Sequence, residues 1–476
     1  MKRICKHYIW LLVAGLLLTS CKKFLTQTSK DELIPASTAD LTQLMNGEAY
    51  PYQTVMDSYI DLLTDDIQCA GIPMVNGSPA IATYSSYLNN GAPVFTWDPS
   101  MFDSAQSVNV VTLTGGDSWK TYYGKIKGCN VVLDYLDKVS GTETEKNALK
   151  GQVLFLRGLY YLKLVTLYCQ PYNGTGIDPA TTQGVPLILS SQVTDENKPR
   201  NTLAEVYNQI EKDLLEAAGL LKDNFVPSNT FRAGHVAAYA LLSRFYLYKG
   251  RDEDMENVIL YAGNALAEKP ALTYLTGYFT ASNAFNLAGI YDLGFSQEVI
   301  WQYSANPKGL TSFLYAPGPT TTLPPFNVSQ ELVNLYDKGT GTGNLGDLRY
   351  TAYYIKTTGA NVWPFRSLKI NPNAVYGDKG IRVAELYLNR AEALIRRGKK
   401  SGNASDLTLA LNDLNTLRIS RYDTRNTAYV PVNITNGDAL WSFYKDERRR
   451  ELCLEDGHRW ADIKRWGLEL HTVLLM

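Results

Sequence analysis

The chain has 476 residues, with 46 Lys and Arg against 47 Asp and Glu, so its formal net charge is −1. This near-neutral balance argues against nucleic acid as a partner, because binding to phosphates requires a basic surface. A chain of this length exceeds what one simple hydrophobic core organises, and we expect about two or three closely packed subdomains.

Residues 1–20 have the pattern of a secretory leader. A basic start precedes an apolar run at 8–18 that is too short to cross a bilayer as a helix. The letters LTSC that follow, ending at Cys21, are similar to a bacterial lipobox, in which the cysteine is acylated after cleavage. An ordinary signal peptide ending near a cysteine is the alternative. We predict a lipid anchor at Cys21, which attaches the protein to a membrane, and a tether over residues 21–38.

Long amphipathic helices dominate the rest of the chain. Apolar residues recur at three- and four-residue spacing, which places them on one face of a helix. Thr202 and Glu205 form a capping box before one such run. The fold class is therefore predominantly α, with a few short strands in the remaining segments. The periodicity predicts helices at about 39–62, 117–138, 145–169, 203–221, 232–249, 254–268, 381–398, 405–420 and 438–456.

Two of these helices share a composition that favours stacked hairpins. The runs at 237–250 and 384–398 both combine alanine, a ridge of Tyr or Leu, and a final basic residue followed by glycine. Small residues let helices approach closely, and a terminal glycine suits a left-handed C-cap. The pattern is similar to tetratricopeptide-type hairpins, although no strict period of about 34 residues runs through the chain. A generic helical bundle is the alternative.

Two blocks, 70–116 and 270–378, lack helical periodicity and are rich in Gly, Pro and aromatic residues. Loops are usually polar, so the many aromatic residues in these loops indicate a structural or functional role. A flat ring either stacks on the apolar face of a sugar or anchors a long loop to the scaffold. The candidate ligand-binding rings are Tyr84, Trp97, Trp301, Tyr303, Tyr315 and Trp363.

Asp65 and Asp66 are a further candidate site. They follow an apolar helical pattern, where their charges oppose the negative end of the helix dipole. Two interpretations stay open at this point, because the pair either caps neighbouring amides or binds a ligand.

No motif for catalysis or metal binding stands out. Glu447, Glu451 and Glu455 recur every four residues, and Glu455 with His458 has the spacing of di-iron ligands. Gly457 interrupts that turn, and the sequence has no second such motif. We predict no enzyme activity, no cofactor and no metal site. A glycoside hydrolase is the less favoured alternative, because its two carboxylates need no local motif. Small buried thiols are expected at Cys69, Cys129, Cys169 and Cys453.

The most distinctive stretch is 447–467, ERRRELCLEDGHRWADIKRWG, where charged residues are interleaved with Leu, Ile and Trp. This mixture indicates that part of the charge is buried, and a buried charge requires a partner. We interpret the segment as an ion-paired clamp that locks the last helix onto the scaffold, with its arginines neutralising its own acids. Its defining residues are Glu447, Arg449, Glu451, Glu455, Gly457, Arg459, Trp460, Asp462, Arg465 and Trp466.

This segment resembles the C-terminal signature of the SusD/RagB family of cell-surface nutrient-binding lipoproteins. The resemblance implies an N-terminal region over 39–269, with a loop insertion at 70–116. It also implies a C-terminal region over 270–476, loop-rich at 270–378 and helical at 380–467. Further runs are similar to successive blocks of the family in the same order, at 119–136, 149–172, 201–218, 231–250 and 380–398.

The same resemblance implies a function. Such a protein is anchored by lipid in the outer membrane, faces the extracellular side and binds oligosaccharide as the lid of a SusC-like TonB-dependent transporter. Peptide or another nutrient is the alternative ligand. Glycan-binding members present a shallow aromatic arc built from loops, and an open site of this kind buries little ligand surface, so we expect modest affinity.

Overall fold

The computed structural model describes residues 34–467, except 53, 55, 58, 72–73, 80–82, 102–116, 281–289, 304–323, 342, 357–363 and 368–378. Helices form most of the regular structure within these residues, and the strands there are short. The prediction of a predominantly α fold is therefore confirmed.

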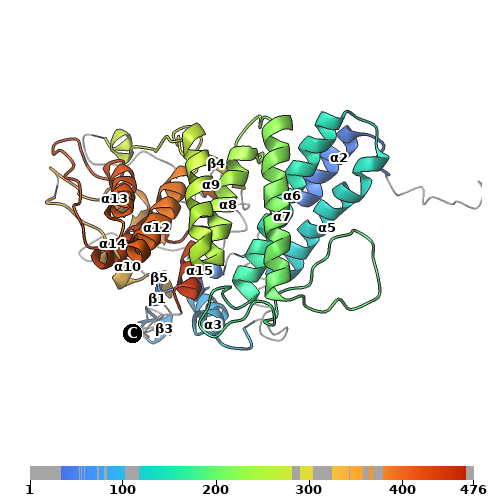
Figure 1. The fold of residues 1–476 in the computed structure, drawn as a ribbon. Helices are drawn as coiled ribbons and strands as arrows, with labels where there is room; N and C mark the ends of the chain where they lie inside the picture. The colour runs from blue at the N-terminus through green and yellow to red at the C-terminus, as the bar shows by residue number, and fades with distance from the viewer. Residues whose placement is uncertain are drawn as a thin grey trace, which may run out of the picture.

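The long helices form one continuous row. Each helix from α5 to α9 packs against the next in chain order, and α12 packs on α9 although residues 269–382 separate them. Figure 1 shows the row crossing the molecule, with α2, α5 and α6 at one end and α13 and α14 at the other. The helices are α2 (Thr38–Leu44), α5 (Ser118–Tyr135), α6 (Glu143–Tyr168), α7 (Leu203–Asn224), α8 (His235–Lys249), α9 (Met255–Glu268), α12 (Val383–Ser401), α13 (Ala404–Ile419) and α14 (Gly437–Leu452).

Side-chain caps start these helices where the sequence places them. Thr202 Oγ1 accepts a hydrogen bond from the Glu205 amide at 3.2 Å, and Glu205 Oε2 accepts one from the Thr202 amide at 2.8 Å. The capping box predicted at α7 is therefore confirmed. Thr142 and Glu145 form a second box at the start of α6. Each box satisfies two backbone donors that the first helical turn leaves without partners.

Glycine ends two helices, although only one of them ends where the sequence predicts. Gly250 closes α8 in the left-handed conformation, with φ at 76°, and its amide donates to Tyr246 O at 3.0 Å. The same role was expected for Gly398, but α12 continues to Ser401 and Gly402 is its left-handed cap. Gly398 instead allows a close approach, because a Cβ there would lie 3.0 Å from Asn403 O.

The predicted helix at 39–62 is wrong beyond its first half. α2 continues as a short π-helix, η2 (Met45–Ala49), which stops at Tyr50. Pro51 follows, and the residue before a proline is disfavoured in a helical conformation. Only a 3₁₀ turn, η3 (Ile60–Leu63), completes the predicted range.

The block at 70–116 contains a helix that its composition did not predict. α3 (Thr83–Phe95) includes Pro93 in its last turn. Proline removes one backbone hydrogen bond from a helix interior, and near the C-terminal end this loss is tolerated because the helix stops two residues later. Gly and Pro content alone was therefore a poor guide to this segment.

The described strands pair into antiparallel two-stranded sheets. In the first sheet Ile67 pairs with Val328, and in another Trp301 pairs with Ile381, so each joins segments far apart in sequence. The pairs are β1 (Ile67–Cys69) with β5 (Phe326–Val328), β2 (Met74–Val75) with β3 (Ser78–Pro79), β4 (Val299–Tyr303) with β8 (Lys379–Arg382), and β6 (Tyr354–Lys356) with β7 (Pro364–Ser367). Short helices complete the fold: η4 (Leu136–Lys138), η5 (Asp252–Asp254), η6 (Leu275–Tyr278), α10 (Gln330–Asn334), α11 (Arg349–Ala352) and α15 (His458–Arg465).

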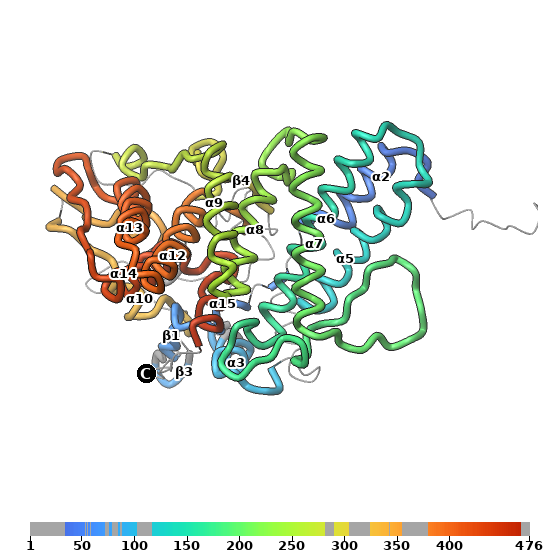
Figure 2. Tube along the Cα trace, viewed as in Figure 1, coloured from blue at the N-terminus to red at the C-terminus, as the bar shows by residue number. Residues whose placement is uncertain are grey.

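Two hydrophobic cores lie on either side of the end of α14. The first fills the helical row and includes Leu440, Tyr444 and Leu452 of α14. The second lies around β1, β5 and α10 and includes Cys453 and Leu454 directly after α14. Figure 2 shows the corresponding path, in which the red C-terminal segment ends beside β1 and α3. The signature segment therefore joins the two cores. The expected buried thiols are found at Cys69, Cys129, Cys169 and Cys453.

Two glycines of α5 provide a test of how closely this helix packs. A Cβ on Gly128 would lie 2.5 Å from Glu48 O, whereas a Cβ on Gly124, about one turn earlier, meets nothing within 4 Å. We expect Gly128→Ala to lower the free energy of unfolding by about 1–3 kcal/mol, because backbone must move. We expect Gly124→Ala to raise it by about 0.5–1 kcal/mol. Urea unfolding measures both, and changes of the same sign would contradict the close approach.

Candidate ligand-binding site

Three glutamates of the signature segment are buried together. Glu447 and Glu451 lie on one face of α14, and Glu455 lies in the turn that follows. None of the three is more than 2% exposed. Carboxylates so far from water remain charged only when cations surround them.

Arginines supply that charge in a compact network. Glu451 Oε2 lies 3.0 Å from Arg349 Nη1 and 3.0 Å from Arg421 Nε, and Glu451 Oε1 lies 3.0 Å from Arg382 Nη1. Arg382 and Arg421 also share Glu298. The network has five arginines, Arg349, Arg382, Arg418, Arg421 and Arg450, and five carboxylates, Asp347, Glu298, Glu447, Glu451 and Glu455.

The arginines hold Glu451 and Glu447 in the ionised form. Burial alone would raise the pKa of Glu451, but Arg421, Arg382 and Arg349 hold it well below its usual range. Burial acts on Glu447 in the same way, and the charges around it hold its pKa well below the usual range as well. The equal numbers of opposite charges thus make a buried polar cluster with no net charge.

The expectation that the segment neutralises its own acids is correct only in part. Within the segment, Arg450 pairs with Glu447, and Arg448 and Arg465 pair with Asp462. The partners of Glu451 come instead from α11, β8 and the turn after α13, namely Arg349, Arg382 and Arg421. Sequence analysis missed these residues because they lie 102, 69 and 30 residues before Glu451, and no local pattern relates them to it. Only Arg382 carried a usable signal, since a charge in a buried strand requires a partner.

Asp65 and Asp66 meet the same segment. Arg459 binds Asp65 through two hydrogen bonds of 2.7 and 2.6 Å. Arg449 Nε donates to Asp66 Oδ1 at 2.7 Å, and its Nη2 donates to Asp65 O at 2.8 Å. Burial raises the pKa of Asp66, against the lowering effect of Arg449. The two acids are therefore ion-pair partners of the signature, which neither earlier interpretation anticipated.

Trp97 lies beside this ion-paired junction and is 39% exposed. It follows α3 in the left-handed conformation, with φ at 55°. Its amide donates to Val94 O at 3.1 Å and the Asp98 amide donates to Pro93 O at 2.9 Å. These two bonds form a Schellman motif with Trp97 at the position that glycine usually occupies. A tryptophan held in this conformation projects a large ring at the end of the helix.

Two contacts fix the Trp97 ring. Its Nε1 donates to Leu63 O at 3.2 Å, two residues before Asp65. Its ring packs edge-to-face on Trp460, with centroids 5.6 Å apart and an interplanar angle of 84°. Trp460 Nε1 donates in turn to Thr166 O on α6 at 3.2 Å. The signature segment thus positions Trp97 against the helical scaffold, and the exposed part of the indole is a rigid platform.

The other candidate rings that lie within the described residues are buried. Trp301 is 0% exposed and packs edge-to-face on Phe155, with ring centroids 5.0 Å apart. A ring with no exposed surface cannot stack on a ligand, so Trp301 is a core residue. Tyr84 is also buried, and Tyr303 donates to Asp456 Oδ1 at 2.8 Å in the interior. Tyr315, Trp363 and Cys21 lie outside the described residues.

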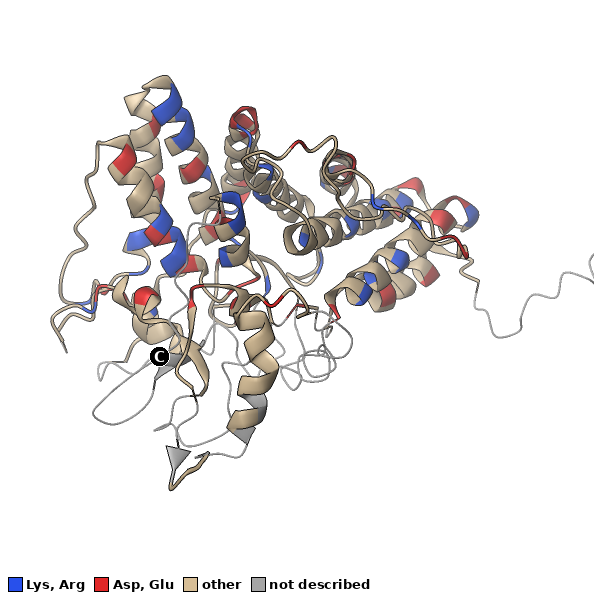
Figure 3. Ribbon diagram, turned by 90° about the horizontal axis from the view of Figure 1, so that it is seen from below, with Lys and Arg blue, Asp and Glu red and all other residues tan. Residues whose placement is uncertain are grey.

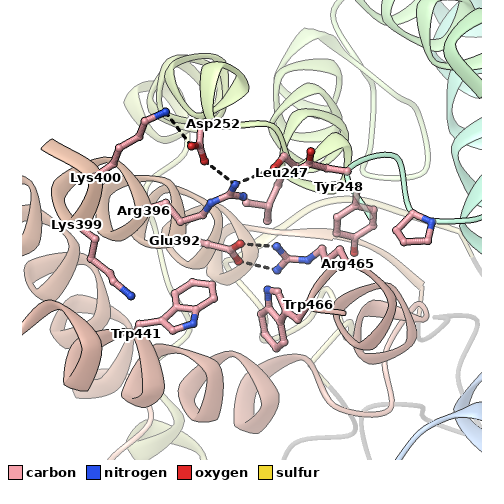
Figure 4. A pocket seen from close by; sticks show the side chains of 13 residues that line it. Leu247, Tyr248, Asp252, Glu392, Arg396, Lys399, Lys400, Trp441, Arg465 and Trp466 are labelled. Atoms are coloured by element: carbon pink, nitrogen blue, oxygen red, sulfur yellow. Dashed lines mark hydrogen bonds and ion pairs between the residues drawn. The ribbon is translucent and has the colours of Figure 1, made fainter. Parts of the chain in front are cut away.

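Arg465 and Trp466 line a cavity of about 460 Å³ at the end of α15. Figure 4 shows Glu392 and Arg465 facing each other across its floor, with Asp252 at the rim. Arg465 Nη2 lies 2.6 Å from Glu392 Oε2, and Asp252 pairs with both Arg396 and Lys400. The charges of this cavity are largely paired with one another. The same close mixture of cations and anions is visible along the helices in Figure 3.

The di-iron spacing of Glu455 and His458 is not realised. Glu455 faces Arg382, whereas His458 Nδ1 lies 2.9 Å from the Tyr248 hydroxyl. Among the described residues, no group of three or more His, Cys, Asp or Glu side chains is arranged to hold a metal ion.

No helix in the described part of the chain is both long enough and apolar enough to span a bilayer.

Comparisons with known proteins agree with this geometry. Residues 48–247 match the family described as "Starch-binding associating with outer membrane", and residues 328–474 match the SusD family. The chain therefore belongs to the SusD/RagB family, a group of glycan-binding proteins associated with the outer membrane. A search of curated proteins found no match.

Solved structures show the same fold. A protein from Bacteroides vulgatus described as a SusD-like carbohydrate binding protein is 25% identical over 90% of this chain and 83% of its own, with a TM-score of 0.63. A SusD superfamily protein from Bacteroides fragilis is 21% identical over 90% of both chains, with a TM-score of 0.64. One from Bacteroides thetaiotaomicron is 20% identical over 91% of this chain and 90% of its own, with a TM-score of 0.62.

Removing Arg459 tests whether the junction under Trp97 is structural. We expect Arg459→Ala to lower the free energy of unfolding by about 1.5–3 kcal/mol, because Asp65 loses two charge-assisted hydrogen bonds. Lys150→Ala is the control, since its ion pair with Glu216 is exposed and its loss should change stability by less than about 1 kcal/mol. Chemical unfolding measures both. A fully stable Arg459→Ala protein that selectively loses its ligand would contradict a structural role.

Acid should weaken the pair between Glu392 and Arg465. Burial would raise the pKa of Glu392, but Arg465 lowers it from 4.5 to about 2. The unfolded carboxyl binds its proton first as pH falls, so this stabilisation is complete above about pH 4.5 and is lost towards pH 2. The loss is on the order of 3 kcal/mol. We expect Glu392→Gln to show a shallower fall in unfolding free energy over this window.

The control for this measurement is Glu216→Gln, which changes an exposed glutamate. It removes the same charge at the surface and therefore controls for the substitution itself. An equally steep fall in Glu392→Gln and in the original protein would show that Arg465 does not hold the carboxyl ionised.

Proposed function

We propose that this protein captures oligosaccharide at the cell surface and delivers it to a SusC-like TonB-dependent transporter. Cys21 is the proposed lipid anchor in the outer membrane, with the fold on the extracellular side. The proposal is supported by the family to which the chain belongs. It is also supported by a relative described as a carbohydrate binding protein.

The exposed ring of Trp97, a residue whose backbone is strained, is the observation that carries the proposal. A left-handed conformation costs a non-glycine residue about 1–2 kcal/mol, and glycine at this helix end would avoid that cost. Strained backbone is kept mainly where a function requires it. A flat indole that is 39% exposed offers a stacking surface for the apolar face of a sugar ring.

Binding of this kind is non-covalent and needs rigid support. Ring stacking fixes the sugar plane, and polar side chains around the platform would bind its hydroxyls. The row of packed helices gives the protein a broad rigid face, and a stable interface with a large transporter requires such an area. The mechanism is therefore capture and presentation, without a chemical step on the ligand.

Two substitutions at Trp97 separate the ring from the backbone strain. We expect Trp97→Ala and Trp97→Gly to weaken glycan binding by about 1–3 kcal/mol each, a range taken from ring stacking on nucleobases. Only Trp97→Gly should also relieve the strain, and it should be more stable than Trp97→Ala by about 1 kcal/mol. A glycan array on residues 22–476 identifies the ligand, and calorimetry then measures both variants.

The same preparation distinguishes the other functions. New reducing ends during incubation of the protein with glycan would identify a glycoside hydrolase and contradict the binding proposal. Saturable affinity for peptides and none for glycans would show that the ligand is a peptide. Co-purification with a barrel transporter and no ligand of either kind would leave only a structural role. Variants at Trp97 that bind like the original protein would assign the ring to loop anchoring.

A further inference from the structure

A second cavity, of about 260 Å³, lies on the helical scaffold away from Trp97. Its walls come from η2 and the residues after it, from the connection between α7 and α8, and from β4. It is lined by Asn46, Tyr50, Tyr52, Phe231, Arg232 and Gln302, among others. Its volume is smaller than that of a typical drug-sized pocket, so it suits one small ring better than a longer oligosaccharide.

The cavity is separate from the Trp97 platform. Tyr50 donates to Gln152 Oε1 on α6 at 2.8 Å, whereas Trp460, beside Trp97, donates to Thr166 O on the same helix. Residues 152 and 166 are about 21 Å apart along an α-helix. A ligand of one sugar unit therefore cannot contact both places.

Two buried acceptors in the wall have no hydrogen-bond partner among the described residues. Gln302 is 0% exposed, and its Nε2 donates to Thr230 Oγ1 at 3.1 Å while its Oε1 is unpartnered. Asn46 Oδ1 is also buried and unpartnered. Neither oxygen has surface open to water, so both lie behind the wall and a ligand in the cavity does not contact them.

Arg232 adds a positive charge without a counter-charge. Its guanidinium lies over the Tyr50 ring, 4.7 Å from the centroid, and no Asp or Glu of the described chain forms an ion pair with it. This differs from the cavity beside Arg465, whose charges are paired with one another. An arginine stacked on a ring keeps its planar fork available, and that fork matches a carboxylate.

The remaining wall is aromatic. Tyr52 is 44% exposed, and its ring packs edge-to-face on Phe231 with centroids 5.8 Å apart. Such a pair covers the apolar face of a six-membered sugar ring without requiring a particular hydroxyl pattern.

From this arrangement we infer that the cavity binds a single carboxylated sugar unit of the hexuronate type. Arg232 pairs with the carboxylate, and Tyr52 with Phe231 covers the ring. The site is additional to the Trp97 platform, and its ligand is an acidic rather than a neutral sugar.

Two matched probes test this inference on residues 22–476, which contain every described residue. Methyl β-D-glucuronide and methyl β-D-glucoside differ only in the carboxylate. We expect the glucuronide to bind at least about ten-fold more tightly, because charge-assisted hydrogen bonds to Arg232 are strong. Ligand-observed NMR titration measures both constants. Acetate at the same concentration should not displace the glucuronide, since it offers no hydroxyls and no ring.

Amino-acid substitutions test whether the glucuronide binds in this cavity. Arg232→Gln should abolish the preference for the glucuronide, and Tyr52→Ala should weaken both sugars. Arg200→Gln is the control, because Arg200 also stacks on a ring, Trp119, at 5.6 Å, but lies elsewhere. Trp97→Ala should leave this binding unchanged, which separates this site from the proposed function. Equal affinity for the two probes, an unaltered preference in folded Arg232→Gln, or displacement by acetate would overturn the inference.

Discussion

The buried network of arginines and carboxylates around Glu451 is the constraint on which the rest of the structure depends. Its arginines come from α11, β8, α13, the turn after α13, and α14, so no part of the chain can form it alone. Leaving one member unpaired in the interior costs several kcal/mol, which makes the correct assembly of all these segments strongly preferred. Residues of α14 belong to one hydrophobic core, and the residues directly after α14 belong to the other.

The same segment also fixes the position of Trp97, which is partly exposed. Arg449 and Arg459 bind Asp66 and Asp65, and the chain just before these acids accepts the indole hydrogen bond of Trp97. Trp460 supports the Trp97 ring from the side and is itself fixed to α6. The family signature therefore positions the Trp97 ring, while Arg449 and Arg459 pair with acids of the protein itself.

Charge pairing also distinguishes the cavities of the scaffold. Around Arg465 the positive and negative groups satisfy one another, so a ligand there would have to displace existing ion pairs. Arg232 forms no ion pair with an Asp or Glu of the described chain. In a protein that pairs so many of its buried charges, an arginine without an ion-pair partner at one cavity is the stronger indication of binding.

The sequence by itself determined the family, the predominantly α class and most helix positions, because helical periodicity, caps such as Thr202 with Glu205, and a dense charged signature are local properties. It also indicated that the signature charges must be buried and paired. Only the tertiary structure decided which partners they have, since Arg349, Arg382 and Arg421 reach Glu451 from distant segments. It likewise separated Trp97, which is exposed, from Trp301, which is in the core. The exposure of a ring depends on which residues pack around it in the fold, and the neighbouring residues in the sequence do not contain that information.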